Sequence, residues 1–271
     1  MAAKCASGGP VGEEVVVAAR GVGHRSRPAP AGRGSLAGTC GRRNRSHPTV
    51  HSGYVDAVNV DGPVHAPTRW ANEGSEKSRW LIEHFRRLVA DGHDLGGEAR
   101  FMDALMPRHA RILDAGCGTG RVTEFLARCG HHVVGVDADP ALIEAARADH
   151  PDLDLRVGNL VDLAAVLGSV PPFDGAMIVG NVMPYLAEDT ETEVLRQVAA
   201  HVKADAPIVV GFGAGFGYAV ADFDAHAEAA GLLLEQRYAT WDLRPWRPGS
   251  DFTVTVLRTR SVLNGQSQAV A

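Results

Sequence analysis

The chain has 271 residues, which is enough to bury a substantial core in one large domain or two small ones. Its hydrophobic content of 45% is that of a soluble globular protein, and the lack of any run of 18 apolar residues excludes a membrane-spanning helix. The formal net charge of -5 is unevenly distributed, because residues 1–65 hold 8 basic and 4 acidic side chains, whereas residues 66–271 hold 19 basic and 28 acidic ones. The acidic balance of residues 66–271 argues against a large nucleic-acid-binding surface.

Cysteine usage bears on the compartment and on metals. The chain has four cysteines, at Cys5, Cys40, Cys117 and Cys129. They lack metal-ligand spacing and are too few for a disulfide scaffold. The sequence therefore predicts no metal site and a reducing compartment, the cytoplasm.

Residues 1–65 differ in composition from the rest of the chain. They are rich in Gly, Pro, Arg, Ser and Ala and show no sustained helical or strand period, so they cannot bury enough apolar surface to offset the entropy of ordering. We expect a disordered basic tail, which is either the product of a misassigned start codon or an organellar transit segment. Residues 261–271 are expected to form a disordered C-terminal tail.

Helical spacing begins after this tail. Over 75–92 the apolar side chains recur at the helical period: Trp80, Leu81, Phe85, Leu88 and Val89. A second helix is predicted over 98–106, where Pro107 ends it. We expect 66–107 to form an N-terminal helical cap on a core at 108–260.

From residue 111 onward, predicted strands and helices alternate. The strands are 111–116, 132–139, 153–159, 173–181, 206–213, 232–243 and 251–260, and the helices that follow the first five are 122–130, 140–150, 161–167, 190–203 and 219–231. Alternation of this kind indicates a parallel sheet covered on both faces, while two final strands without a helix between them pair antiparallel or lie apart. We predict a Rossmann-like, doubly wound α/β fold with a seven-stranded, mostly parallel sheet and an antiparallel last strand.

The stretch RILDAGCGTG places Gly116, Gly118 and Gly120 directly after the first predicted strand. Glycine permits positive φ there and lets a ligand touch the backbone, and the next helix points its amide groups at that ligand. Asp137 ends the second predicted strand, where an acid hydrogen-bonds the hydroxyls of a ribose. These features predict a nucleoside-like ligand at the carboxyl ends of the strands.

The spacing of the glycines distinguishes between nucleoside ligands. A dinucleotide fingerprint, Gly-x-Gly-x-x-Gly, would require glycine where the chain has Arg121. The observed Gly-x-Gly-x-Gly follows Asp114, whose carboxylate suits a cationic ligand better than a pyrophosphate. The pattern therefore favours a positively charged nucleoside ligand over NAD.

Three segments, ILDAGCGTGRVTEFLA, VVGVDADPALIEAAR and FDGAMIVGNVMPYL, resemble motifs of the class I S-adenosylmethionine-dependent methyltransferases. The resemblance covers roughly residues 75–260. It implies S-adenosylmethionine as the cofactor, with the methionine part held by the glycine loop and the ribose by Asp137. It further implies that Ala138 lies under the adenine, that Asn159 faces the adenine amine, and that Gly180 and Asn181 lie beside the methyl group.

The cofactor residues implied by the resemblance form one set: Asp114, Gly116, Gly118, Gly120, Asp137, Ala138, Asn159, Leu160 and Gly180. Some of these positions also have purely structural interpretations. Gly120 could serve helix–strand packing, and Asn159 could cap the next helix. Asp139 is expected only to start a helix, and the pair His131 and His132 is expected at the surface.

The acceptor pocket is expected from the later loops on the same side of the sheet. Their aromatic residues are Tyr185, Phe212, Phe216, Tyr218, Trp241 and Trp246. The candidates for acceptor contact are Asn181, Tyr185, Trp241, Asp242 and Arg244. An aromatic pocket suits a planar or apolar small molecule, although the two tryptophans could instead pack the last hairpin onto the N-terminal helices.

Methyl transfer from a sulfonium is a direct displacement, so the protein mainly aligns the reacting atoms. A general base is needed only when the nucleophile carries a proton, and no obligatory catalytic triad is expected. We predict a methyltransferase acting on a small molecule, with no nucleic-acid or membrane partner. The alternatives are a non-catalytic module that binds S-adenosylmethionine and an NAD-dependent oxidoreductase.

Overall fold

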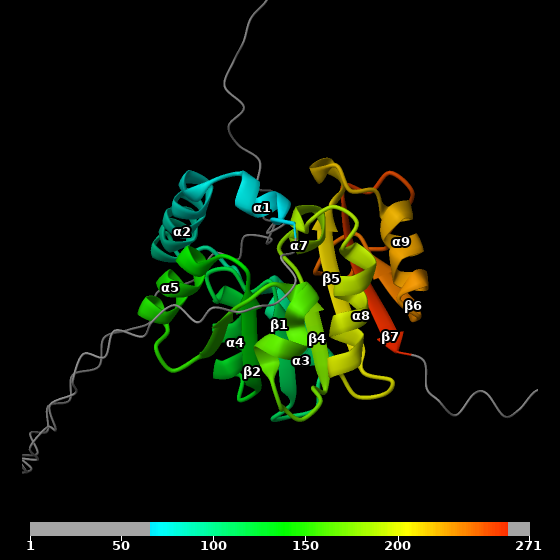
Figure 1. Ribbon diagram of the computed structural model, residues 1–271, viewed down its shortest axis with the longest axis horizontal. Coiled ribbons are helices and arrows are strands. Elements are labelled where there is room, and N and C mark those ends of the chain that lie inside the picture. The colour runs from blue at the N-terminus through cyan, green and yellow to red at the C-terminus, as the bar shows by residue number, and fades with distance from the viewer. Residues whose placement is uncertain (1–65, 260–271) are drawn as a thin grey trace, which may run out of the picture. The chain divides into compact units, whose positions relative to one another are not determined.

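A seven-stranded sheet runs through the residues that the computed structural model describes, 66–259 (Figure 1). Its strands are β1 (Arg111–Ala115), β2 (His132–Asp137), β3 (Asp154–Val157), β4 (Gly175–Ile178), β5 (Pro207–Gly213), β6 (Leu232–Tyr238) and β7 (Phe252–Thr259). The spatial order is β3-β2-β1-β4-β5-β7-β6. Strands β1 to β5 pair in parallel, and β7 pairs antiparallel with both β5 and β6. The predicted Rossmann-like sheet with an antiparallel last strand is confirmed.

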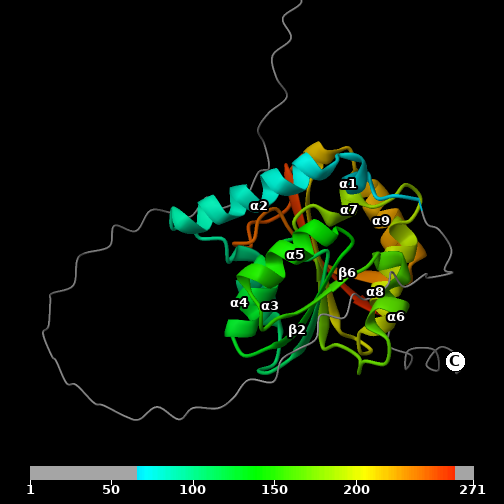
Figure 2. The same ribbon diagram turned by 60° about the vertical axis from the view of Figure 1, so that its left-hand side comes forward.

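The helices divide between the two faces of this sheet (Figure 2). Their bounds are α1 (Arg69–Asn72), α2 (Ser75–Ala90), α3 (Gly97–Leu105), α4 (Arg121–Arg128), α5 (Pro140–Asp149), α6 (Leu163–Leu167), α7 (Val182–Tyr185), α8 (Glu191–His201) and α9 (Val220–Ala229), with 3-10 turns η1 (Leu160–Asp162) and η2 (Ala214–Phe216). Among residues 66–259, none of these helices has the length and apolar character needed to cross a membrane. The predicted tails, 1–65 and 261–271, lie outside the described residues.

Side chains that alternate along the strands build two separate cores. Leu113, Ile178 and Val210 point to the face covered by α6, α8 and α9. Their neighbours Ile112 and Met177 point to the opposite face and pack with α3 and α4. Because both faces are covered, the central strands are buried almost throughout, as expected for a parallel sheet.

The expectation that both histidines of the His131–His132 pair lie at the surface is wrong for His131. Its imidazole Nε2 lies 2.9 Å from the carboxylate of Asp103 on α3, and its Nδ1 accepts the backbone N–H of Ala110. His131 is buried, whereas His132 is exposed. The partner of the imidazole lies 28 residues earlier on another helix, so local sequence could not indicate it.

Helices α1 and α2 lie over the carboxyl ends of the strands, where the chain order reverses between β1 and β4 (Figure 1). The amphipathic α2 is held against α5 by a bidentate ion pair between Arg86 and Asp149, with both hydrogen bonds at 2.9 Å. Ligands of doubly wound folds bind at this switch point. The N-terminal helices therefore lie above the position where the sequence predicts the ligand.

Candidate active site

The three glycines after β1 have positive φ angles, but each serves a different purpose. A side chain at Gly116 would overlap Val182 of α7, so this glycine allows α7 to pack against the loop. A Cβ at Gly118 would meet nothing within 4 Å, and Gly118 lines a pocket. Gly120 is the N-cap of α4, and a Cβ there would touch Ala146 of α5 at 3.4 Å. Only the first two glycines line the pocket, and Gly120 has the packing role.

Asp114 lies at the base of this loop with its side chain buried in β1. Its carboxylate accepts a hydrogen bond of 2.6 Å from the Thr123 hydroxyl on α4. Burial raises the pKa of Asp114 to about 6, against the opposing effects of that hydrogen bond and of the Arg121 charge. At neutral pH the group is therefore a carboxylate facing the pocket.

Asp137 ends β2 on the opposite side of the loop. One carboxylate oxygen accepts the Gly118 amide at 2.8 Å and the other accepts the Asp139 amide at 2.9 Å. Burial raises the pKa of Asp137 to about 6, and the two backbone amides act in the opposite direction. Each oxygen keeps a further lone pair, so the carboxylate can still accept the two hydroxyls of a ribose.

These groups meet in one pocket at the carboxyl ends of β1, β2 and β4. The predicted residues that line it are Asp114, Gly116, Gly118, Asp137, Ala138, Asn159, Leu160, Gly180, Asn181, Tyr185 and Trp241. Asn159 also accepts the Val161 amide and so caps η1, which means that its capping and pocket-lining interpretations are compatible. The charged, glycine-rich half of this pocket presents carboxylates and closely approachable backbone, which can bind hydroxyl and charged groups of a ligand.

The other half of the pocket is aromatic. We call Asn181, Tyr185, Phe216, Trp241 and Phe252 its aromatic end. The rings stand over the carboxyl end of β5, because a Cβ at Gly213 would lie 3.2 Å from Phe216 and one at Gly211 would overlap Trp241. Two glycines in β5 thus give the rings the space in which to lie against the strand.

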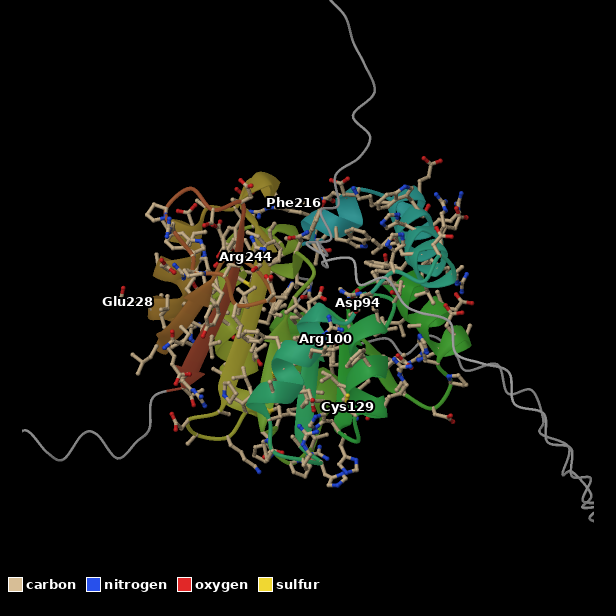
Figure 3. The ribbon with its side chains drawn as sticks, turned by 180° about the vertical axis from the view of Figure 1, so that it is seen from behind. Asp94, Arg100, Cys129, Phe216, Glu228 and Arg244 are labelled. Atoms are coloured by element: carbon tan, nitrogen blue, oxygen red, sulfur yellow. The ribbon has the colours of Figure 1, made fainter. Side chains whose placement is uncertain are left out.

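Five residues expected near the acceptor, Trp246 among them, lie elsewhere. Phe212 points to the opposite face of β5 from Gly211 and Gly213 and packs against Tyr218, whose hydroxyl lies 2.7 Å from Nδ1 of His226. Asp242 and Arg244 are exposed and form an ion pair with each other at 3.4 Å in the β6–β7 connection, where Figure 3 labels Arg244. Side chains alternate between the two faces along β5, which explains why Phe212 points away from the pocket. No local pattern in the sequence distinguishes Asp242 and Arg244 from residues that line the pocket.

The two tryptophans of the β6–β7 connection, Trp241 and Trp246, have different surroundings. Trp241 lines the pocket and also packs against Phe101 of α3, so the lining and packing interpretations both apply to it. Trp246 does not line the pocket, and its ring lies against the guanidinium of Arg237.

Sequence reasoning missed the residues that the N-terminal segment and α4 bring to the pocket: Thr68, Trp70, Lys77, Leu81, Phe85, Glu98, Arg121 and Val122. Glu98 of α3 and Arg121 of α4 form a bidentate ion pair, with hydrogen bonds of 2.7 and 3.0 Å. The guanidinium also lies over the Phe85 ring and donates to the Leu95 carbonyl. Arg121 directly follows the glycine loop, and that position was the signal available in the sequence.

The sequence and the fold match known methyltransferases. A methyltransferase-domain model matches residues 112–205. The crystal structure of a TehB-like SAM-dependent methyltransferase from Corynebacterium glutamicum ATCC 13032 Kitasato is 42% identical, with a TM-score of 0.64, and the match covers 69% of this chain and 100% of that one.

Two curated relatives match over shorter stretches. The magnesium-protoporphyrin O-methyltransferase of Rhodobacter capsulatus is 39% identical over 40% of this chain and 49% of its own length. The ubiquinone biosynthesis O-methyltransferase of Xanthomonas axonopodis pv. citri (strain 306) is 42% identical over 22% of this chain and 27% of its own. The chain thus spans between about a quarter and a half of the length of these two relatives.

Proposed function

Because the chain belongs to the class I S-adenosylmethionine-dependent methyltransferases, we propose that it transfers a methyl group from S-adenosylmethionine to a small-molecule acceptor. The observation that carries the proposal is the Asp137 carboxylate, hydrogen-bonded to the Gly118 amide in a pocket whose other end is aromatic. The acidic balance of residues 66–271 supports a small molecule over a nucleic acid as the acceptor. The cysteine usage supports action in the cytoplasm.

When bound, S-adenosylmethionine supplies a methyl group on a positively charged sulfur that is a good leaving group. Asp137 would accept the ribose hydroxyls, and Ala138, Asn159 and Leu160 would surround the adenine. Asp114, Gly116 and Gly118 would hold the methionine part. Each of these residues lines the pocket.

The Glu98–Arg121 pair suits the amino-acid end of the cofactor. That end carries a carboxylate and an ammonium group, and the pair presents a cation and an anion in the same pocket. Arg121 is close enough to Asp114 to oppose the rise in its pKa, so the pair lies near the glycine loop. We assign Arg121 to the methionine carboxylate, with Glu98 and Asp114 on the side of the ammonium group.

For the transfer itself, the chain's residues hold the acceptor in line with the methyl group and exclude water. Positioning of this kind contributes up to about 7–11 kcal/mol in well-oriented reactions. Tyr185, Trp241 and Phe252 form an apolar wall that suits this task.

Calorimetry with S-adenosylmethionine, S-adenosylhomocysteine and NAD tests the proposal, and we expect the first two to bind. Turnover on a metabolite extract, followed by mass spectrometry, should then show a product heavier by one methyl group. Binding without any methylated product would favour a regulatory module, and binding of NAD alone would favour an oxidoreductase.

A matched pair of glycine variants tests the loop. Gly118 and Gly168 both have φ between 50° and 60°, and a Cβ at either would meet nothing within 4 Å, but only Gly118 lines the pocket. Gly118→Val should weaken binding of S-adenosylmethionine by about 5- to 150-fold, the range that overpacking of 1–3 kcal/mol gives. Gly168→Val changes a glycine outside the pocket and should leave the affinity for S-adenosylmethionine unchanged.

A further inference from the structure

The ionisable side chains of the pocket are already engaged at its cofactor half. Both carboxylate oxygens of Glu98 are bonded to Arg121. Lys77 at the rim lies 3.8 Å from Glu73. Asp114 and Asp137 accept hydrogen bonds from Thr123 and from the backbone, as described above.

Tyr185 is the ionisable side chain of the aromatic end. Burial, with a smaller effect of the Glu73 charge, raises the pKa of its phenol, so the group stays protonated at neutral pH and does not remove a proton from an acceptor. Its ring meets Trp70 edge-on at 5.4 Å and Phe216 at 6.1 Å. Among the described residues that line the aromatic end, none is therefore placed to serve as a general base.

Asn181 brings one side-chain NH₂ group, with two N–H donors, to the aromatic end. Its side chain is buried, and its Oδ1 accepts the Gly213 amide at 2.8 Å, which fixes the orientation of the amide group. Within residues 66–259 the Nδ2 group makes no hydrogen bond, and the residue lines the pocket. The Asn181 amide can therefore donate to an acceptor atom of a bound ring.

Building on the proposed methyltransferase function, we propose that the methyl acceptor is an uncharged nitrogen heteroaromatic ring, methylated at a ring nitrogen that carries a lone pair and no proton. The ring lies between the Tyr185, Phe216 and Trp241 side chains, and Asn181 donates a hydrogen bond to a second polar atom of the ring. The ring nitrogen forms the new bond to the methyl carbon with its lone pair. The carbon–sulfur bond breaks with its electron pair remaining on sulfur, so the positive charge passes to the ring and no proton moves.

The charges of the pocket agree with a neutral acceptor and a cationic product. Three carboxylates, on Glu98, Asp114 and Asp137, face two cations, on Lys77 and Arg121. This excess of negative charge favours a positive charge on sulfur before the transfer and on the ring after it. Aromatic faces also stabilise a cation through the electrostatic attraction of the ring. An anionic acceptor would find no unpaired cation among the described residues of the aromatic end.

Four probes of similar ring size test the acceptor class: isoquinoline, quinazoline, 2-naphthol and 2-naphthoate. Binding to the full chain loaded with S-adenosylhomocysteine is measured by quenching of tryptophan fluorescence, which requires no turnover. Turnover is measured by mass spectrometry of the product and by formation of S-adenosylhomocysteine. We expect isoquinoline and quinazoline to bind and to yield N-methyl cations, with a kcat/KM that shows no ionisation of an enzymic base between neutral and alkaline pH.

Variants separate the aromatic end from the rest of the protein. Phe216→Leu and Trp241→Leu should each weaken binding of isoquinoline by roughly 2- to 10-fold, since an aromatic pair contributes about 0.5–1.5 kcal/mol beyond area burial. Trp246→Leu, in the same β6–β7 connection but outside the pocket, should leave the binding of isoquinoline unchanged. Asn181→Asp keeps the oxygen that accepts the Gly213 amide and loses the donor, so it should abolish any preference for quinazoline over isoquinoline.

The outcomes distinguish the acceptor class from the methyltransferase function. Methylation of 2-naphthol or 2-naphthoate with no methylation of the heteroaromatic probes would overturn the acceptor class and leave the function intact. Binding of S-adenosylmethionine without binding of either heteroaromatic probe would also overturn the class. Failure of S-adenosylmethionine itself to bind would overturn the proposed function instead.

Discussion

Asp137 is a carboxylate whose ionised form is opposed by burial and supported by the amides of Gly118 and Asp139. Burial raises the pKa of Asp114, across the glycine loop, to a similar value, but its hydrogen-bond partner is the Thr123 hydroxyl. Both groups therefore change charge close to pH 6, near the physiological range. This shared property gives two predictions at the residue scale.

The affinity for S-adenosylmethionine should fall as the pH falls through about 6, because a protonated Asp137 loses capacity to accept the ribose hydroxyls. Well below that pH, each required ionisation should lower the affinity about tenfold per pH unit. Asp137→Asn should weaken binding at neutral pH by roughly 1.5–3 kcal/mol and should flatten the pH dependence to that of Asp114. Calorimetry between acid and neutral pH measures both effects, and an identical pH profile in the two proteins would refute the ribose assignment.

Asp114 should lower the stability of the protein at neutral pH. Its pKa in the fold, about 6, lies above its ordinary value of 3.8, so the folded state holds the proton more tightly than the unfolded chain. Its contribution therefore favours folding at acid pH and is lost as the pH rises through 6. Asp114→Asn should raise the free energy of unfolding at neutral pH by about 1–3 kcal/mol while weakening cofactor binding. Urea denaturation checks the first effect, and unchanged or lower stability would contradict it.

The positions of Asp114 and Asp137 were predictable because parallel strands bring their carboxyl ends to one edge of the sheet. Glu98 and Trp70 were not, since they reach the pocket from helices that pack on the core at a distance along the chain. The different roles of Gly118 and Gly120 also depend on neighbours from α5, which spacing alone does not reveal.

At the scale of elements, Asp139 connects the ribose-binding turn to the helices above it. One carboxylate oxygen caps α5 by accepting the amides of Ala141 and Leu142. The other accepts the Trp70 indole N–H at 2.7 Å and the hydroxyl of Ser78 on α2. The sequence predicts the cap from an Asp-Pro pair, but the two longer-range bonds come from segments 61 and 69 residues away.

Loss of this connection should loosen α1 and α2. Asp139→Ala should lower the free energy of unfolding by about 1 kcal/mol through the lost cap, and it should speed dissociation of S-adenosylmethionine because Trp70 and Leu81 line the pocket. Arg86→Ala is the matched control on α2, because it removes only the exposed ion pair between Arg86 and Asp149 of α5. This variant should change the free energy of unfolding by less than about 1 kcal/mol. Stopped-flow fluorescence of the bound complex measures dissociation, and equal rates in the two variants would contradict a specific role for Asp139.

At the scale of the whole molecule, strand–helix alternation was sufficient to predict the class of fold and the direction of the last strand. The position of β7 between β5 and β6 was not predictable from it, because alternation does not specify which of the last two strands pairs with β5. The N-terminal helices were predicted as elements, but their place above the pocket follows from tertiary contacts.

Every described residue that lines the pocket falls between Thr68 and Phe252. A chain that begins at Ala66 should therefore bind S-adenosylmethionine with an affinity within about twofold of the full chain. A tenfold loss of affinity in the shorter chain would give residues 1–65 a role in binding.

The place of β7 in the sheet has a consequence for synthesis on the ribosome. β7 is made after β6, yet it is the strand that joins β6 to β5. A nascent chain that stops before Phe252 therefore leaves an open edge on β5 and no partner for β6, and both edges are available for wrong pairing with other chains. The same late segment carries Phe252, and Trp241 precedes it by only a few residues, so a chain competent to bind its acceptor is completed only with the last described strand.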